Sequence, residues 1–482
     1  MTSTAMSSPA LAPDDASSSA KAAGPAWAAA LVMFALASVA VSLWLFFDFP
    51  LAELPVYFGA HWFILDATSL LFVCVINLVF LGISVYLYAW AHDREQHVHH
   101  VRMRAALSML FMLAMSLGVM SNHLLVLWAL IEITTLCATP LVTLGYGTEP
   151  HRVAWRYLLY SSMSLGLTFL GFMCLTRSAH LAGLPIDFAL DKLSGSLPPQ
   201  MDLWQRLGLS FIMLGLGSKL GLAPLYAWLP ETYETAPTST SALLAAVQFN
   251  ISVVAVFRIL QAFQGHDTGF MSNQLLIMGG LSLIVASIQV MAAKNYKRLI
   301  AYACVSSSGV IAMGLSVGKA AAYGVVLYVV SNAFVKAMLF LAAGRMRAVY
   351  GTNDIAALSG VIKRLPFAGS IFALGVFALL GLPPFGSFMA EMLILSGIVQ
   401  RDNMMAFTLM CAMLTIIFVA TGRAVFPMLW GPLKSDLEAV KEPLVTMLPM
   451  MAFVAMLVLL GIYTPDVISN LLLVVAQSIG GS

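Results

Sequence analysis

The stretch from Lys219 to Ser241 reads KLGLAPLYAWLPETYETAPTSTS, and it decides how the rest of the chain is interpreted. It places a lysine inside an apolar segment and then interrupts that segment with Pro224 and Pro230. Proline removes a helical hydrogen bond, and lipid offers no replacement partner for the freed backbone group. A lysine within a membrane is also costly and marks a functional site by default. We therefore expect a broken transmembrane helix whose lysine has a function.

The composition predicts an all-α polytopic membrane protein. Of the 482 residues, 60% are hydrophobic and 10% are charged, and the mean hydropathy is +0.91. Soluble domains contain about 25% charged residues. Nearly uncharged runs, long enough for the ~18 residues that span a bilayer, recur along the whole chain. This pattern excludes a soluble protein with a large apolar core, and we expect the lipid bilayer but no nucleic acid among its partners.

Apolar runs between breakers predict about thirteen transmembrane helices. They are expected at residues 26–47, 64–91, 103–120, 123–144, 156–176, 207–228 (broken near Pro224), 238–263, 272–292, 299–317, 320–344, 366–400 (broken at Pro383 and Pro384), 404–422 and 446–476. Residues 1–25 are rich in Ala, Ser and Pro and are predicted to be a disordered N-terminal tail. The tail lacks the basic start of a signal peptide, so we expect the first helix to be retained.

The distribution of basic residues predicts the orientation of the chain. Sixteen of the 24 Lys and Arg residues fall in predicted loops on the N-terminal side of the membrane, and five fall on the other side. Cytoplasmic loops are the ones enriched in Lys and Arg. We expect a multi-pass protein of a prokaryotic cytoplasmic membrane, with a cytoplasmic N-terminus and an external C-terminus.

The chain contains an internal repeat. Gly221–Glu231 reads GLAPLYAWLPE and Gly381–Glu391 reads GLPPFGSFMAE, and the two agree at Gly, Leu, Pro and the final Glu. Broken helices in corresponding positions are typical of transporters built from inverted repeats. We predict repeats at residues 103–263 and 272–425, accessory transmembrane helices at residues 26–102 and a C-terminal transmembrane helix at residues 446–476.

Four ionisable residues lie inside predicted spans: Glu132, Lys219, Lys336 and Glu391. An isolated charge at mid-membrane costs about 2.5–3.5 kcal/mol on insertion scales, so these groups need partners or water. Glu132 is the natural partner for Lys219, and such a pair could switch its protonation state. The alternative is that the charges only tie helices together.

Other ionisable groups have more ordinary explanations. Arg258 lies near a predicted helix end and could extend to the surface, or it could be functional. Asp66 is expected to mark a helix start. Four histidines between residues 92 and 100 could bind a metal, but a solvated cytoplasmic loop explains them more simply.

No cofactor, metal or catalytic centre is expected in this chain. The five cysteines stand alone inside apolar segments, and their spacing does not suit zinc or an iron–sulfur cluster. The sequence also lacks a phosphate-binding glycine loop and a nucleophile elbow. Whether the chain belongs to an enzyme is left open by its residues, since any redox chemistry would belong to partner subunits.

Five blocks of sequence resemble the antiporter-like proton-translocating membrane subunits shared by respiratory complex I, Mrp antiporters and membrane-bound hydrogenases. The resemblance covers about residues 62–425, and the last block is most similar to the hydrogenase-4 component F branch. The blocks are WALIEITTLCATP, SKLGLAPLYAWLPETYETAPTSTSALL, KNYKRLIAYACVSSSG, SNAFVKAMLFLAAG and GLPPFGSFMAEMLIL.

The resemblance implies a role for each charged residue. Glu132 and Lys219 would form the coupled ion pair, Lys336 would be the central relay residue and Glu391 the terminal group of a proton pathway. The family plan usually has fourteen helices, and the first would be missing here. The resemblance also implies a secondary polar axis of Gln248, Asn250, Arg258, Ser307 and Asn332. Asn250 stands where many relatives have lysine, and Ser307 and Asn332 stand where histidine is common.

The resemblance implies a proton-translocating subunit of a complex-I-like or hydrogenase-4-like redox complex. Its partners would be other membrane and peripheral subunits, and the transported ion would be the proton, with sodium as an alternative. Two further functions stay open. One is a subunit of an Mrp-like cation/proton antiporter, and the other is the proton-coupling module of an inorganic-carbon uptake complex with a zinc carbonic-anhydrase-like partner.

Overall fold

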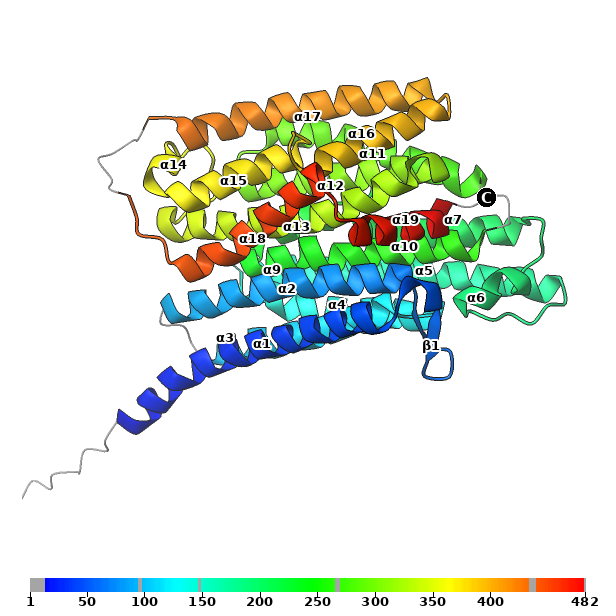
Figure 1. Ribbon diagram of the computed structural model, residues 1–482, viewed down its shortest axis with the longest axis horizontal. Coiled ribbons are helices and arrows are strands. Elements are labelled where there is room, and N and C mark those ends of the chain that lie inside the picture. The colour runs from blue at the N-terminus through cyan, green and yellow to red at the C-terminus, as the bar shows by residue number, and fades with distance from the viewer. Residues whose placement is uncertain (1–13, 94–97, 146–148, 265–268, 433–438, 481–482) are drawn as a thin grey trace, which may run out of the picture.

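The computed structural model describes residues 14–93, 98–145, 149–264, 269–432 and 439–480, and it is a bundle of roughly parallel helices (Figure 1). This confirms the predicted all-α membrane fold. Within the described ranges, the β structure consists of isolated bridges and one small antiparallel hairpin. The hairpin pairs β1 (Val56–Phe58) with β2 (Phe63–Leu65) at one end of the bundle. The predicted helix at 64–91 therefore begins later than expected, at Ala67.

The long helices follow the predicted apolar runs. They are α1 (Asp14–Asp48), α2 (Ala67–Asp93), α3 (Val98–Val119), α4 (Leu124–Thr143), α5 (Pro150–Leu181), α7 (Leu203–Leu220), α10 (Phe249–Ala262), α11 (Gly269–Ala292), α12 (Tyr296–Ser316), α13 (Lys319–Tyr350), α15 (Pro366–Leu379), α16 (Gly386–Gln400), α17 (Met404–Trp430), α18 (Leu444–Ile462) and α19 (Asp466–Gly480). Short helical segments complete the fold: η1 (Leu51–Glu53), α6 (Leu190–Leu193), η2 (Ser194–Ser196), α8 (Trp228–Thr235), α9 (Thr238–Ala242), the π-helical turn η3 (Leu243–Gln248) and α14 (Val361–Arg364).

The number of crossings agrees with the prediction. Eleven helices in the described ranges are long and apolar enough to span a membrane. The two interrupted pairs, α7 with α8 and α15 with α16, account for the two remaining predicted crossings. The start of α1 and the end of α19 lie at opposite ends of the bundle (Figure 1), as an odd number of crossings requires.

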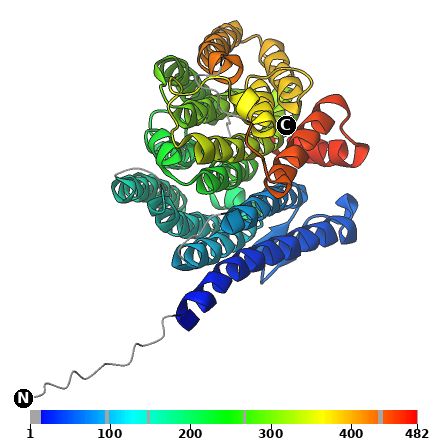
Figure 2. The same ribbon diagram turned by 90° about the vertical axis from the view of Figure 1, so that its left-hand side faces the viewer.

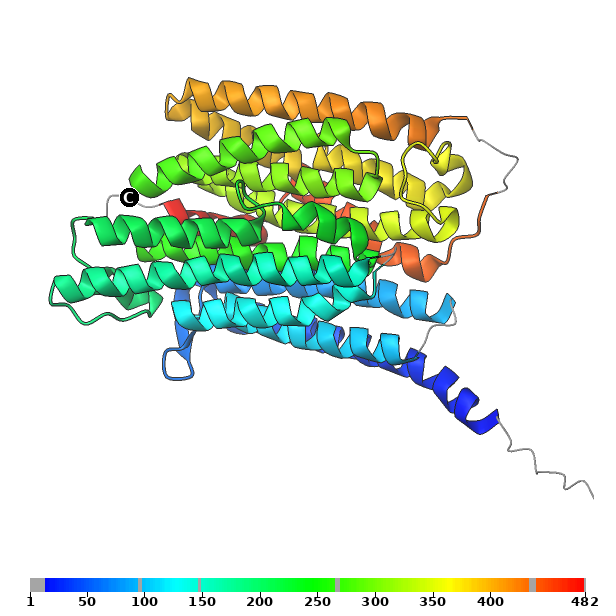
Figure 3. The same cartoon turned by 180° about the vertical axis from the view of Figure 1, so that it is seen from behind.

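Both proline-rich stretches interrupt a helix, as predicted. The first helix ends at Leu220, where Gly221 adopts a left-handed conformation with a φ of 86°. The second ends at Leu379 and is followed by Gly381, with a φ of 63°. Helix α7 enters the bundle from the end opposite to that of α15 (Figures 1 and 3), so the two broken helices run in opposite directions, as inverted repeats require.

Helix α13 forms the centre of the bundle. Its apolar membrane-spanning segment is 100% buried inside the protein, whereas the corresponding segments of α1 and α17 are only 22% buried. It packs against α2, α12, α16, α18 and α19. The end-on view in Figure 2 shows α1 at the edge of the assembly. The charged residue Lys336 therefore lies on the helix that is most shielded from lipid.

Two predicted boundaries were wrong. Helix α1 begins at Asp14 instead of residue 26, because the alanine-rich stretch before Pro25 favours helix; residues 1–13 of the predicted tail lie outside the described residues. The single predicted helix at 446–476 is two helices, α18 and α19, separated at Tyr463–Pro465. Pro465 has no N–H group to continue α18. The repeat boundaries themselves stay predictions.

Candidate functional site

Lys219 lies in the last turn of α7, directly before the helix break. The break exposes backbone carbonyl groups at a helix C-terminus, and this end of a helix dipole favours a cation. The break is held by side chains: Ser218 donates to the Leu225 carbonyl at 2.9 Å, and Trp228 donates to the Ser218 carbonyl at 2.9 Å. The lysine is 3% exposed, so its ammonium group depends on protein partners.

Lys219 and three surrounding side chains, Thr135, Tyr157 and Gln248, form what we call the Lys219 cluster. The Nζ atom of Lys219 donates a hydrogen bond to Thr135 Oγ1 on α4. The same atom lies 5.8 Å from the ring centre of Tyr157 on α5, within the range of a cation–π interaction. The Tyr157 hydroxyl is hydrogen-bonded to the side-chain amide of Gln248 at 3.2 Å. The cluster thus links α7, α4, α5 and the π-helical turn η3.

Glu132 does not form the direct ion pair that we expected. Its Oε1 accepts a hydrogen bond from Ser162 at 2.5 Å, and Oε2 is buried without a hydrogen-bond partner in the described part of the chain. No ion pair within 4.0 Å joins it to Lys219 there. Thr135, the actual partner of Lys219, lies one helical turn further along α4. Glu132 is still close enough to act on Lys219 electrostatically.

Lys336 is completely buried at the centre of α13. Its Nζ atom lies 3.1 Å from the ring centre of Phe249, the residue that follows the π-helical turn. Among the described residues this Nζ atom has no hydrogen-bond partner. Burying an amino group without a partner is costly, so its retention points to function rather than to stability.

Glu391 lies on α16, shortly after the second break, and is 6% exposed. Its carboxylate packs against Gly381 so closely that a Cβ atom on that glycine would overlap it. Three neighbours, Tyr328, Ser307 and Asn332, complete what we call the Glu391 cluster. Tyr328 and Ser307 line one small cavity together with Glu391, and Asn332 bonds the Tyr328 carbonyl. In the sequence repeat, Glu391 corresponds to Glu231. Lys219 therefore comes before its helix break, whereas Glu391 comes after its own.

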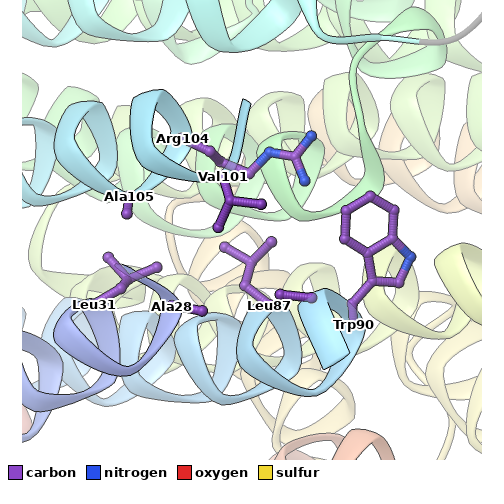
Figure 4. Close-up of a pocket in the computed structure, with 8 residues that line it drawn as sticks. Ala28, Leu31, Leu87, Trp90, Val101, Arg104 and Ala105 are labelled. Atoms are coloured by element: carbon purple, nitrogen blue, oxygen red, sulfur yellow. The ribbon is translucent and has the colours of Figure 1, made fainter. Parts of the chain in front are cut away.

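A cavity of about 20 Å³ adjoins the Glu391 cluster, enough for one water molecule. Its polar lining comes from Glu391, Tyr328, Ser306 and Ser307, and its apolar lining includes Leu414 and Ile417 on α17. By contrast, the pocket of about 20 Å³ between α1, α2 and α3 is lined mainly by apolar side chains (Figure 4). The guanidinium of Arg104 lies 5.0 Å from the Trp90 ring centre there, and neither residue belongs to the clusters above.

The remaining residues of the predicted secondary axis have different environments. Gln248 belongs to the Lys219 cluster, and Asn332 donates to the Tyr328 carbonyl at 2.9 Å. Ser307 donates to the Ala303 carbonyl at 3.0 Å. Asn250 is buried and donates to Ala246 of its own helix, which leaves its Oδ1 without a partner among the described residues.

Arg258 does not extend to the surface. It is 3% exposed and binds both carboxylate oxygens of Asp66, at 2.6 and 2.8 Å. Burial raises the pKa of Asp66 and the Arg258 guanidinium lowers it, and the net result is a pKa below the ordinary value of an aspartate. Asp66 also accepts a hydrogen bond from the Ser69 N–H at 2.8 Å, which confirms it as a helix start. This pair ties α10 to α2 and lies apart from the two clusters.

Two buried groups were not predicted from the sequence. Lys297 falls between two predicted helices, but it is 0% exposed and donates to the carbonyls of Glu234 and Ala236, at 3.0 and 2.6 Å. It therefore holds the end of α8 against α12. Tyr157 was not singled out because a tyrosine in an apolar helix resembles ordinary core. Its position four residues before Ser161 on a face with Ser164 was the only available signal.

Two oppositely directed broken helices around buried charges define a transporter-type membrane protein. Residues 121–430 match the model of the family described as NADH:quinone oxidoreductase/Mrp antiporter, TM. The chain belongs to this family, and it is an antiporter-like membrane subunit of the type found in complex I, Mrp and hydrogenase assemblies.

Curated relatives agree over most of their length. A hydrogenase-4 component F homolog of Methylacidiphilum infernorum is 27% identical over 417 residues, which cover 84% of this chain and 86% of the relative. The NADH-quinone oxidoreductase subunit N of Desulforudis audaxviator is 28% identical over 425 residues, covering 83% and 81%.

Solved structures share the fold. A chain of an archaeal membrane-bound sulfane sulfur reductase superimposes with a TM-score of 0.80 at 22% identity, over 96% of both chains. A chain of respiratory complex I from Thermus thermophilus gives a TM-score of 0.79 at 22% identity, over 96% of this chain and 99% of that one. Both are subunits of multisubunit membrane complexes.

Proposed function

We propose that the protein moves protons across the membrane along Glu132, Lys219, Lys336 and Glu391, as a subunit of a complex-I-like or hydrogenase-4-like assembly. One observation supports this most strongly. Lys219, Lys336 and Glu391 are at least 94% buried inside the membrane-spanning bundle, yet none of the three forms an ion pair within 4.0 Å in the described residues. Groups placed at such cost are usually functional.

Contacts between the two clusters and Lys336 support a single route. The Lys219 cluster reaches Gln248, whose neighbour Phe249 contacts Lys336. Along α13, Tyr328, Asn332 and Lys336 recur every four residues and therefore share one face. That face ends at Glu391, beside the cavity that can hold water. Polar side chains and water would connect the four ionisable residues, and redox chemistry would belong to partner subunits.

Replacing Lys219 with alanine tests this role. In the purified, fully assembled complex reconstituted in vesicles, Lys219→Ala is expected to abolish proton uptake, because the route loses one proton-carrying group. Proton uptake is measured with a pH-sensitive dye. Lys192→Ala, at an exposed lysine outside the bundle core, is the matched control and should pump normally. Full assembly with unchanged pumping by Lys219→Ala would refute the assignment.

A second candidate function is cation/proton antiport in an Mrp-like complex. A putative antiporter subunit of Staphylococcus aureus is 27% identical over 375 residues, covering 77% of this chain and 72% of that protein. Identifying the subunits that co-purify separates the possibilities. Flavin or iron–sulfur subunits support redox-driven pumping, small antiporter subunits support antiport, and a carbonic-anhydrase-like protein supports inorganic-carbon uptake. Sodium-dependent proton movement without a redox substrate would also favour antiport.

A further inference from the structure

We infer that Tyr157 is a positioning residue, whose hydroxyl group holds Gln248 of the Lys219 cluster in place, and that Tyr328 is its counterpart beside Glu391 in the other half of the protein. The inference rests on the proposed proton route and adds two residues to it. Its basis is the arrangement of side chains around each tyrosine.

The Tyr157 hydroxyl lies where three elements meet. It bonds the Gln248 amide at 3.2 Å, and the ring that carries it lies 5.8 Å from the Nζ atom of Lys219. Gln248 is followed by Phe249, the residue whose ring contacts Lys336. The Tyr157 side chain therefore faces Lys219 with its ring, while its hydroxyl bonds the residue next to the contact of Lys336.

Gln248 is the last residue of a π-helical turn, and such turns often mark functional sites. The wider turn shifts the register of the helix, so that Gln248 faces Tyr157 while Phe249 faces Lys336. A hydroxyl that fixes Gln248 consequently fixes the segment between the two lysines.

The second half of the chain places a buried tyrosine in a similar position. Tyr328 lines the same small cavity as Ser307 on α12 and Glu391, and Asn332, one turn further along α13, donates to the Tyr328 carbonyl at 2.9 Å. Helix α5 packs on both parts of the first broken helix, α7 and α8, as α13 packs on both parts of the second, α15 and α16. Each broken helix is therefore faced by a helix that carries a buried tyrosine beside the charged residue.

The hydroxyl is the group that matters, since a phenylalanine would pack equally well. The Tyr157 ring packs against the Trp228 ring with centres 5.4 Å apart, and phenylalanine preserves this contact. Phenol oxygen both donates and accepts a hydrogen bond. Removing it leaves the Gln248 amide without this hydrogen bond while the hydrophobic core is kept.

The test uses Tyr157→Phe in the assembled complex, with Tyr296→Phe as control. Both tyrosines are completely buried, but the Tyr296 hydroxyl bonds Asn353 at 3.0 Å, away from the clusters. We expect Tyr157→Phe to assemble normally and to translocate protons about 2- to 10-fold more slowly, the effect of one hydrogen bond. The pH of half-maximal rate should shift in Tyr157→Phe and remain unchanged in Tyr296→Phe.

A double-mutant cycle with Gln248→Leu tests the proposed partner. If the hydroxyl acts through Gln248, the double variant is no slower than the slower single variant, whereas independent effects would multiply. Should Tyr157→Phe fail to assemble, Gln248→Leu alone removes the same bond and is expected to slow translocation equally. A wild-type rate and pH profile in these variants, alongside an inactive Lys219→Ala, overturns this inference and leaves the proposed function standing. Unchanged pumping by Lys219→Ala overturns the proposed function instead.

Discussion

The ion pair between Asp66 and Arg258 shows how a single buried contact supports the bundle. Both carboxylate oxygens of Asp66 accept from the guanidinium, and the two side chains are 20% and 4% exposed. Removing one partner of a buried pair leaves the other charge uncompensated and costs about 3–5 kcal/mol. The pair fastens α2 to α10, the helix that follows the π-helical turn.

We predict that Asp66→Asn lowers the free energy of unfolding by about 2–4 kcal/mol, measured by thermal unfolding in detergent. Asp187→Asn is the control, because its ion pair with Lys192 is exposed and 3.7 Å long and should matter by less than about 1 kcal/mol. An equal effect of the two substitutions would contradict the structural role of Asp66.

The pair also predicts an acid-sensitive contribution to stability. The pKa of Asp66 is lower in the folded protein than its ordinary value of about 4. Its contribution is therefore complete above pH ~4 and disappears as the pH falls through the folded-state pKa. The difference in melting temperature between wild type and Asp66→Asn should shrink in acid, and a difference that stays constant with pH would refute this.

At the scale of secondary-structure elements, the two helix breaks fix the positions of Lys219 and Glu391. Each break begins at a left-handed glycine, and Gly381 is additionally covered by the Glu391 carboxylate. A methyl group at residue 381 would displace that carboxylate, whereas Gly183, also left-handed, faces open space. The backbone conformation makes both substitutions unfavourable, and only one disturbs the site.

Gly381→Ala and Gly183→Ala should each lose about 1–2 kcal/mol of stability, because alanine is strained in the left-handed region. We expect Gly381→Ala alone to reduce proton translocation, by about tenfold or more, since the carboxylate is moved out of its cluster. Vesicle assays of both variants at matched complex content measure this. Equal activities would show that the contact between Gly381 and Glu391 is incidental.

The helix breaks could be predicted because proline removes a helical hydrogen bond and a charge is costly in an apolar segment, so both are visible in the sequence. The helix end before Pro465 was missed because the apolar runs on either side of Thr464, Pro465 and Asp466 were joined into one predicted span. The predicted partner of Lys219 was also wrong. Spacing identifies Glu132 and Thr135 as residues one turn apart on α4, but only the packing of α7 against α4 decides which of them the lysine reaches. Lys297 was missed for the same reason, since its partners are backbone carbonyls.

Across the whole molecule, the surplus of Lys and Arg in loops at one end of the bundle gives a testable orientation. Lys363 belongs to the short helix α14, at the end of the bundle where α1 begins, and Lys192 belongs to α6, at the opposite end (Figure 1); both are exposed. In a cysteine-free background, a membrane-impermeant thiol reagent applied to intact cells should label Lys192→Cys but not Lys363→Cys. The reverse labelling would refute the proposed cytoplasmic N-terminus.

The burial of α13 also determines which parts of the protein the lipid can influence. Bilayer thickness and acyl-chain composition act on a protein through the helices that touch lipid, and α13 touches none along its best spanning window. Lipid will instead contact α1 and α17, whose surfaces are mostly not buried by the rest of the protein. Lys336 on α13 is therefore insulated from changes in membrane composition, while any contact that neighbouring subunits make with the peripheral helices is exposed to them.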